Sequence, residues 1–396
     1  MSFQAPPNYV KYVLSQLESR GHLAYLVGGC VRDMILGVHP HDWDVCTSAL
    51  PWQVEEIFPH TRATGIKHGT VTVLSSSHPV EVTTFRREGG YADHRHPDAV
   101  SFVGDLTEDL ARRDFTVNAI ALPLEGFAAD PFGGIRDIEN KLIRCVGDGE
   151  KRFEEDALRM LRAFRFSARL DFAIEENTLL AIKEKAYLSE YLAPERVRDE
   201  LEKLLLTKKP DTVYELIGAG LLDGFLSCRL PEEGLPTFSR MPHKAMSRFM
   251  LLCAVLKSHG CISSAEEFLT RLRLDSRTVR CCDEAEEMLR SPVPECPLAW
   301  KRLLNRYGAE SVLLYAQCLD ARSGGKNVKA LKAVLKSGEC YSAKHLAVTG
   351  DDLLELGYRG RELGEMLRFL LDYVMEHPEN NTREILLSLA GGTEEI

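Results

Sequence analysis

Two glycines and two aspartates near the N-terminus are the residues best suited to chemistry. Gly28 and Gly29 stand between a strand-like run and a helical segment, where small residues let backbone N–H groups approach phosphate oxygens. Asp42 and Asp44 follow in a β-rich run, and a period of two places both carboxylates on one face of a strand. Such a pair suits Mg²⁺ that bridges nucleotide phosphates. The order of these residues predicts a combined phosphate and metal site.

A third carboxylate and a pair of arginines follow in the next strand-like segments. Glu81 lies among apolar and β-branched residues in the run Val80–Phe85, where it could assist the metals or an attacking hydroxyl. An edge-strand glutamate is the ordinary alternative. Arg112 and Arg113 enter the strand-like run Val117–Leu122 and could clamp a triphosphate. A structural salt bridge explains that arginine pair equally well.

The segment Glu150–Leu170 is predicted as one helix with two contrasting faces. At about 100° per residue, apolar residues gather on one side and arginines on the other. The arginine face contains Arg159, Arg162, Arg165 and Arg169, with Asp156 at its edge. An ordinary solvated face mixes Lys with Glu, whereas the planar fork of Arg can bind a base edge or a phosphate. This helix therefore predicts a surface that binds nucleotides.

These residues require a mixed α/β region followed by helices. Short β-rich runs are predicted at Leu23–Val27, Trp43–Cys46, Gly69–Leu74, Val80–Phe85, Val117–Leu122 and Leu142–Val146. Helical segments interrupt them at Cys30–Leu36, Pro51–Phe58 and Leu106–Ala111. Strand signals nearly vanish after Gly149, and a linker is predicted near 225–240. The fold class is therefore α+β, with a mixed-sheet head followed by an all-α body and tail, and the predicted divisions are 1–148, 149–230 and 231–396.

Composition limits the classes of protein further. The 396 residues include 49 basic and 59 acidic ones, and the net charge of −10 speaks mildly against a nucleic-acid partner unless a local basic surface exists. No apolar run approaches the ~18–20 residues of a membrane-spanning helix, and no secretory signal precedes the first helix. The eleven cysteines form no CxxC pair and are expected to be free thiols. A cytoplasmic protein without membrane contact is predicted.

Five segments, taken in order, resemble the motifs of class II CCA-adding enzymes. These are tRNA nucleotidyltransferases of the poly(A) polymerase/tRNA nucleotidyltransferase family, in the DNA polymerase β superfamily. The segment Gly28–Asp33, together with Asp42 and Asp44, resembles the first motif. The other four segments are Arg112–Ala119, Asp130–Asp137, Glu155–Arg159 and Glu195–Glu200. The resemblance covers residues 28 to about 205 and is highly specific.

The resemblance implies template-independent addition of C, C and A to the 3′ end of tRNA, using CTP and ATP and releasing pyrophosphate. It implies Mg²⁺ at Asp42 and Asp44, and Glu81 is assigned to the same catalytic site. The nucleotide-binding residues it implies are Gly28, Gly29, Arg32 and Arg113 at the triphosphate, Asp156 and Arg159 at the base, and Arg162 and Arg165 nearby. It also implies a catalytic nucleotidyltransferase head, a neck whose helices bind nucleobase and RNA, and a body and tail that bind tRNA.

Related activities stay open at this point. In bacterial poly(A) polymerases the region after the first motif looks like Gly-Arg-Arg-Phe-Arg. At that place this chain has Gly65-Ile66-Lys67-His68-Gly69 instead. Enzymes that add only CC lack a flexible loop, which Arg87–Ala99 supplies here, so CC-only addition is disfavoured. Addition of A alone is not excluded by the sequence, and a non-catalytic RNA-binding protein would not need the carboxylates. No protein partner is indicated, and a homodimer is left open.

Overall fold

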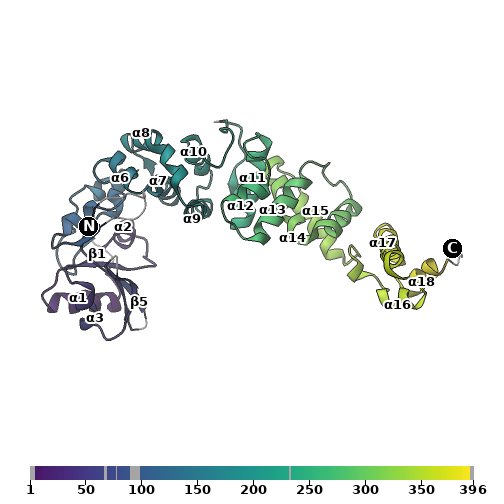
Figure 1. Cartoon of the computed structure of the whole chain (residues 1–396), viewed down its shortest axis with the longest axis horizontal. Helices are drawn as coiled ribbons and strands as arrows, with labels where there is room; N and C mark the ends of the chain where they lie inside the picture. Colours follow the sequence, from purple (N-terminus) through teal and green to yellow (C-terminus); the bar gives the residue numbers. More distant parts are fainter. Residues whose placement is uncertain (1–4, 67–68, 77, 90–98, 232, 393–396) are drawn as a thin grey trace. The chain divides into compact units, whose positions relative to one another are not determined.

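The computed structural model describes residues 5–66, 69–76, 78–89, 99–231 and 233–392. The chain divides into two compact units, Met1–Arg229 and Leu230–Ile396. The first unit combines sheet and helices, and in the described residues the second unit contains helices without strands (Figure 1). This arrangement confirms the predicted α+β fold class. Among the described residues, no helix is both long enough and apolar enough to cross a membrane.

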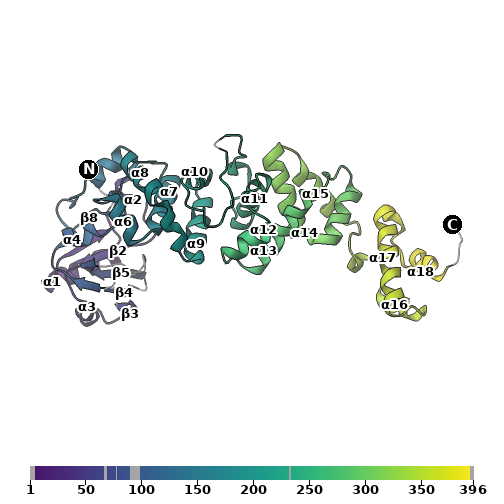
Figure 2. The same ribbon diagram turned by 45° about the horizontal axis from the view of Figure 1, so that its top comes forward.

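Six strands form the main sheet of the first unit, in the order β3-β4-β5-β2-β1-β8 (Figure 2). They are β1 Ala24–Val27, β2 Asp44–Thr47, β3 Thr61–Gly65, β4 Thr70–Ser75, β5 His78–Thr84 and β8 Ala121–Leu122. β2 and β5 run parallel and their neighbours run antiparallel, so the sheet is mixed. Two smaller pairs join β6 Arg86–Gly89 to β7 Ala99–Phe102, and β9 Leu142–Ile143 to β10 Ala173–Ile174.

Helices lie against the sheet of the first unit and continue beyond it. α1 Asn8–Ser19 and α3 Pro51–Ile57 pack against β4 and β5, and α2 Gly29–Ile35 packs against β1. The remaining helices of this unit are α4 Leu106–Ala111, α5 Gly134–Glu139, α6 Gly149–Glu155, α7 Leu158–Leu170, α8 Glu176–Lys185, α9 Pro194–Leu205 and α10 Thr212–Gly218. Cys46 of β2 packs in a cluster with Leu110 of α4. Because side chains alternate along a strand, Asp44 lies on the same face as Cys46.

The second unit contains α11 Ala245–Ser258, α12 Ala265–Arg271, α13 Ser276–Met288, α14 Pro297–Ser323, α15 Asn327–Ser337, α16 Gly350–Glu355, α17 Gly360–Glu376 and α18 Arg383–Gly391. Short 3₁₀ segments in the chain include η2 Thr116–Asn118, η3 Ala186–Tyr191, η4 Phe238–Arg240, η5 Ala343–His345 and η6 Pro378–Asn380. α14 is bent where Gly308 adopts φ 79°, a conformation that a glycine tolerates best. The last three helices enclose their own apolar cluster around Leu370 and Leu371.

Several predicted elements differ from the structure. The single helix predicted over 150–170 is two helices, because Asp156 has extended dihedrals of −143° and 101° between α6 and α7. The strand predicted over 117–122 starts as the 3₁₀ turn η2, and only Ala121–Leu122 pair. β2 begins at Asp44, so Asp42 stands in the bend before the strand. Residues 90–98 of the predicted flexible loop lie outside the described residues, and β6 and β7 flank them.

The turn before α5 joins two parts of the head through an unusually close backbone approach. The Asp130 carboxylate accepts hydrogen bonds from the backbone N–H of Gly134 at 2.6 Å and of Ile135 at 2.9 Å. A Cβ atom on Gly134 would stand 2.1 Å from the carbonyl oxygen of Thr116. The Thr116 hydroxyl in turn donates to Asp137 of α5. The turn therefore fixes η2 against α5 and requires glycine at position 134.

We predict that Gly134→Ala destabilises the first unit by at least about 2 kcal/mol, because the backbone of Thr116 cannot yield as a flexible side chain would. The measurement is denaturant unfolding monitored in both the variant and the parent. Gly218→Ala is the matched control: it ends α10, and its Cβ meets nothing within 4 Å. Equal stability of Gly134→Ala and Gly218→Ala would contradict this account of the turn.

Candidate active site

Three carboxylates gather where β2 begins. The parallel register of β2 and β5 places Asp44 directly opposite Glu81. Asp42 lies in the bend two residues before β2 begins. Burial, together with the charges of Glu81 and Asp42, raises the pKa of Asp44 to about 6, and the charge of Arg113 opposes this rise. This concentration of negative charge is what a cation neutralises, and carboxylate oxygens are the donors that hard cations prefer.

Asp42 and Asp44 could hold a divalent metal only together with further ligands. Within the described ranges, no three His, Cys, Asp or Glu side chains are grouped to hold a metal by themselves. Mg²⁺ is commonly bound through one or two carboxylates together with substrate phosphates and water. Asp42 and Asp44 therefore fit a metal that arrives with a nucleotide, and they do not form a closed all-protein cage.

The glycine turn stands directly beside the carboxylates. Gly28 has φ 79° and ψ −136°, which a residue with a Cβ rarely adopts. A Cβ at this position would lie 3.2 Å from Nη1 of Arg113 and 3.6 Å from Oδ2 of Asp44. The structure thus brings together Gly28, Asp44 and Arg113, which the sequence separates widely.

Arg32 lies behind the turn and is almost fully buried, with 2% of its surface exposed. It donates to Oδ1 of Asp33 at 2.9 and 2.6 Å and to Oδ1 of Asn118 at 2.6 Å. A Cβ on Gly29 would stand 3.5 Å from its Nη2 atom. Arg32 therefore fastens α2 to the segment after α4, and contact of Arg32 or Gly29 with a triphosphate stays a prediction.

Asp109 of α4 organises the two adjacent arginines. Its carboxylate accepts from Arg112 at 2.9 and 2.8 Å and from Nη2 of Arg113 at 3.2 Å. Burial alone would raise the pKa of Asp109, but the two guanidinium groups outweigh it and lower that pKa. Nε of Arg113 is buried and has no hydrogen-bond partner in the part of the chain that the structure describes. An unsatisfied buried donor is costly, and an oxyanion would satisfy it.

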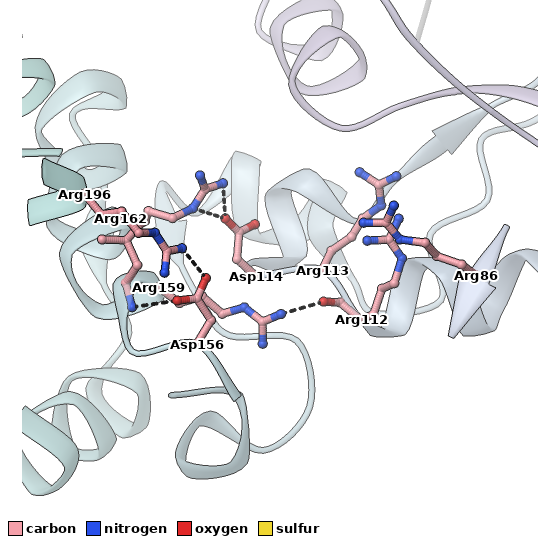
Figure 3. Close-up of a pocket in the computed structure, with 9 residues that line it drawn as sticks. Arg86, Arg112, Arg113, Asp114, Asp156, Arg159, Arg162 and Arg196 are labelled. Atoms are coloured by element: carbon pink, nitrogen blue, oxygen red, sulfur yellow. Dashed lines mark hydrogen bonds and ion pairs between the residues drawn. The ribbon is translucent and has the colours of Figure 1, made fainter. Parts of the chain in front are cut away.

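A cavity of about 290 Å³ opens beside Arg113. Figure 3 shows Asp114 and Asp156 among the arginine side chains that surround it. Six arginines, two aspartates and one leucine line it: Arg86, Arg112, Arg113, Arg159, Arg162, Arg196, Asp114, Asp156 and Leu158. Such an excess of positive charge in a confined space favours an anionic ligand.

Asp156 and Arg159 are held by separate sets of partners. Asp156 accepts from the backbone N–H of Leu158 at 3.1 Å and from Nη2 of Arg196 at 3.0 Å (Figure 3). Arg159 donates to Glu155 at 2.6 Å and to the carbonyl oxygen of Arg112 at 3.1 Å. They were predicted to lie one turn apart on one helix, which is wrong because Asp156 stands at the junction between α6 and α7. Both side chains nevertheless line the cavity.

Arg162 and Arg165 of α7 form largely buried ion pairs, so this part of the arginine face is not a freely solvated surface. Arg162 donates to Oδ2 of Asp114 at 2.8 and 2.6 Å. Burial opposes ionisation of Asp114, yet Arg162 and Asn118 overcome it and lower the pKa of Asp114 to about 2. Arg165 pairs with Glu200 of α9 and does not line the cavity. Of the two, only Arg162 borders the predicted nucleotide space.

The chain matches three family models in succession. Residues 24–144 match the "Poly A polymerase head domain", and residues 171–232 match the "Probable RNA and SrmB- binding site of polymerase A". Residues 248–390 match the second domain of tRNA nucleotidyltransferases. The model matches thus follow the chain through both compact units.

Whole-length relatives are similar to this chain from end to end. A CCA-adding enzyme of Limosilactobacillus fermentum is 36% identical over 96% of this chain and 95% of the relative. One from Enterococcus faecalis is 37% identical over 96% and 94%. The chain belongs to the CCA-adding enzyme family. The predicted family and enzyme class, a tRNA nucleotidyltransferase that adds CCA, are confirmed.

Solved structures of CCA-adding enzymes agree with the fold. The structure of the Bacillus stearothermophilus enzyme in complex with CTP covers 98% of this chain and 97% of its own, with a TM-score of 0.81 and 34% identity. A Thermotoga maritima enzyme complexed with tRNA has a TM-score of 0.65 at 23% identity, which supports the fold alone.

Sequence reasoning missed four residues of the cavity in this CCA-adding enzyme, which are Arg86, Asp114, Leu158 and Arg196. Asp114 and Arg196 belong to segments that resembled family motifs, but neither was assigned to the site, whereas Arg112 was expected as a possible triphosphate clamp. Arg86 opens β6 immediately after β5, and no spacing rule singled it out. Buried salt bridges decide which of these arginines face the cavity, and a linear sequence does not contain that information.

We predict that Asp44→Asn stabilises the metal-free protein at pH 7 by on the order of 2 kcal/mol while abolishing catalysis. A carboxyl whose pKa rises from 3.8 to about 6 on folding favours the folded state at low pH. That contribution is complete below pH 4 and is lost as the pH rises through about 6. Removing the charge should therefore help at pH 7 and have no effect near pH 3.5 to 4.

The check is the midpoint of urea unfolding with EDTA present, measured at both pH values. Asp42→Asn is the matched control, because Asp42 is exposed and its charge is solvated. An equal gain in stability at pH 7 in both variants, or no gain in either, would contradict the conclusion that the buried charge of Asp44 destabilises the fold.

Proposed function

We propose that the head of this chain transfers nucleotides from CTP and ATP to the 3′ end of tRNA, adding C, C and A without a template. One observation carries the proposal: Arg113 adjoins both the carboxylates at the start of β2 and the arginine-lined cavity. A nucleotide whose triphosphate lies at Arg113 would place its base toward Asp156 and its phosphates toward Asp44. The names of the relatives support the same substrates.

The chemistry proposed here is in-line transfer. The 3′-hydroxyl oxygen of tRNA attacks the α-phosphorus of the nucleotide and forms a new O–P bond, the bond to pyrophosphate breaks, and the hydroxyl proton is released to solvent. Arg112 and Arg113 hold the charge of the leaving pyrophosphate, and Asp109 keeps both guanidinium groups in place. Asp42 and Asp44 would hold Mg²⁺, which supplies charge neutralisation at the phosphate oxygens. Glu81 sits opposite Asp44 and strengthens the affinity of that site for cations.

Base selection is proposed for Asp156 and Arg159. A carboxylate accepts from the exocyclic amine of cytosine or adenine, and an arginine donates to the cytosine carbonyl or to an adenine ring nitrogen. Uracil lacks that amine, so binding it leaves buried polar groups unpaired at a cost of about 1–3 kcal/mol each. Nη1 of Arg196 is buried without a partner among the described residues, which leaves one more donor at this end of the cavity.

The divisions 1–148, 149–230 and 231–396 are proposed as the catalytic head, the neck and the tRNA-binding body and tail. Addition of A alone is the second candidate, since Asp156 and Arg159 accept adenine as readily as cytosine.

The deciding experiment supplies purified protein and Mg²⁺ with tRNA that ends before its CCA, and with CTP and ATP singly and together. CTP alone should add two residues, and both nucleotides should add three. Asp42→Ala should lower incorporation by several orders of magnitude while tRNA binding, measured by filter retention, persists. His41→Ala changes the exposed neighbour and serves as the control. Addition of A only to tRNA already ending in CC would establish the A-adding alternative.

We predict that Asp156→Ala loses discrimination against UTP and GTP more than it loses affinity for the triphosphate, and that Arg159→Ala behaves likewise. Incorporation of each of the four nucleotides is compared at matched concentrations on tRNA ending before CCA. Glu154→Ala is the control, because this exposed residue of α6 pairs with Lys185 outside the cavity. If both variants slow down yet keep parental selectivity, the cavity is an electrostatic clamp and the base-reading role fails.

A further inference from the structure

Helix α15 of the second unit has a row of lysines on one face. Lys329, Lys332 and Lys336 fall within an arc of about 60° when successive residues are placed 100° apart. Leu331 and Val334 occupy the other side and are buried, with α15 packed against α14. All three lysines are exposed. The packing of α15 therefore fixes the direction in which the three ammonium groups face.

These lysines have no ion-pair partner among the described residues. Between Ala321 and Gly338 the sequence contains five cations and no acid. The carboxylates that flank this stretch in the sequence have other partners. Asp320 accepts from the backbone N–H groups of Asn327 and Val328 at 2.8 and 3.0 Å, and Glu339 pairs with Lys301. The row therefore retains its full positive charge in a chain whose net charge is −10.

Several arginines of the same unit, in contrast to these lysines, form ion pairs. Seven arginines of this unit each pair with a carboxylate: Arg277, Arg280, Arg290, Arg302, Arg306, Arg361 and Arg383. The row differs from these arginines, because three cations share one helix face and the sequence from Ala321 to Gly338 contains no acid. We propose that Lys329, Lys332 and Lys336 form a binding surface for the sugar-phosphate backbone of RNA, which we call the α15 lysine row.

The chemistry of the row matches phosphates better than bases. Lysine is a point charge on a flexible stem, without the planar fork that recognises a base edge. The three residues span about 10 Å along the helix axis, a length that covers successive phosphates of one strand. Binding through charge alone is independent of sequence, as an enzyme that acts on many tRNAs requires. The inference rests on the proposed function, which makes tRNA the polyanion that this enzyme must hold.

The test is the salt dependence of tRNA binding by the triple variant Lys329→Gln, Lys332→Gln, Lys336→Gln. Glutamine keeps helix propensity close to that of lysine, so α15 should remain folded. The slope of log K against log salt should fall by about 2 to 3, and Kd near 0.1 M salt should rise about tenfold or more. Incorporation at saturating tRNA should be unchanged, with the loss appearing in KM.

The matched control is Arg277→Gln, Arg280→Gln, Arg361→Gln, which removes the same net charge from arginines that are already paired. It should leave the slope close to that of the parent. An equal change in both triple variants would overturn the proposal, since net charge alone would explain it. Weaker binding of the lysine variant to anionic vesicles, with tRNA binding intact, would also overturn it in favour of a membrane surface.

Failure of this proposal and failure of the proposed function give different results. If the parent protein adds no nucleotide to tRNA lacking CCA, the function itself is wrong. If the parent adds CCA and the lysine variant binds tRNA with parental slope and Kd, the α15 lysine row is not an RNA surface and the function stands.

Discussion

The parallel pairing of β2 with β5 is the constraint on which the site depends. It places the carboxylates of Asp44 and Glu81 side by side, where burial and mutual repulsion hold the pKa of Asp44 near 6. Two like charges in this position destabilise the fold unless cations stand close by. Arg113 supplies one cation, and a metal brought by a nucleotide would supply more. The same register that gives the sheet its hydrogen bonds thus creates the need for a positive ligand.

Burying a charged arginine side chain costs free energy. In this structure each buried arginine near the site is paired with a carboxylate, which reduces that cost. Asp109 holds Arg112 and Arg113, Asp114 holds Arg162, and Glu200 holds Arg165. Removing one partner of such an ion pair leaves a buried charge uncompensated. This is far more destabilising than replacing both partners with uncharged residues. These ion pairs orient the guanidinium groups before any nucleotide arrives, and preorganised groups of this kind lose little freedom when a ligand binds.

Much of this arrangement could be predicted from the sequence, for reasons that differ between elements. The β-rich runs located β4 and β5, but the period of two wrongly put Asp42 on the same strand as Asp44, because Asp42 lies in the bend before β2. The break at Asp156 could not be predicted from helical periodicity, because apolar residues keep their spacing through both α6 and α7. Only the extended dihedrals of Asp156 and its bond to the N–H of Leu158 reveal that α7 starts anew there.

The α6–α7 junction determines how the two side chains proposed to read the base are held. On a continuous helix, the direction of a carboxylate is set by the turn beneath it. Asp156 stands outside the helices, and its direction is set by Leu158 on one oxygen and by Arg196 of α9 on the other. Arg159 is anchored separately, by Glu155 and by the backbone at Arg112. The carboxylate and guanidinium groups that we propose to read the base therefore depend on different partners, and a substitution of Arg196 would remove a partner of the carboxylate but none of Arg159.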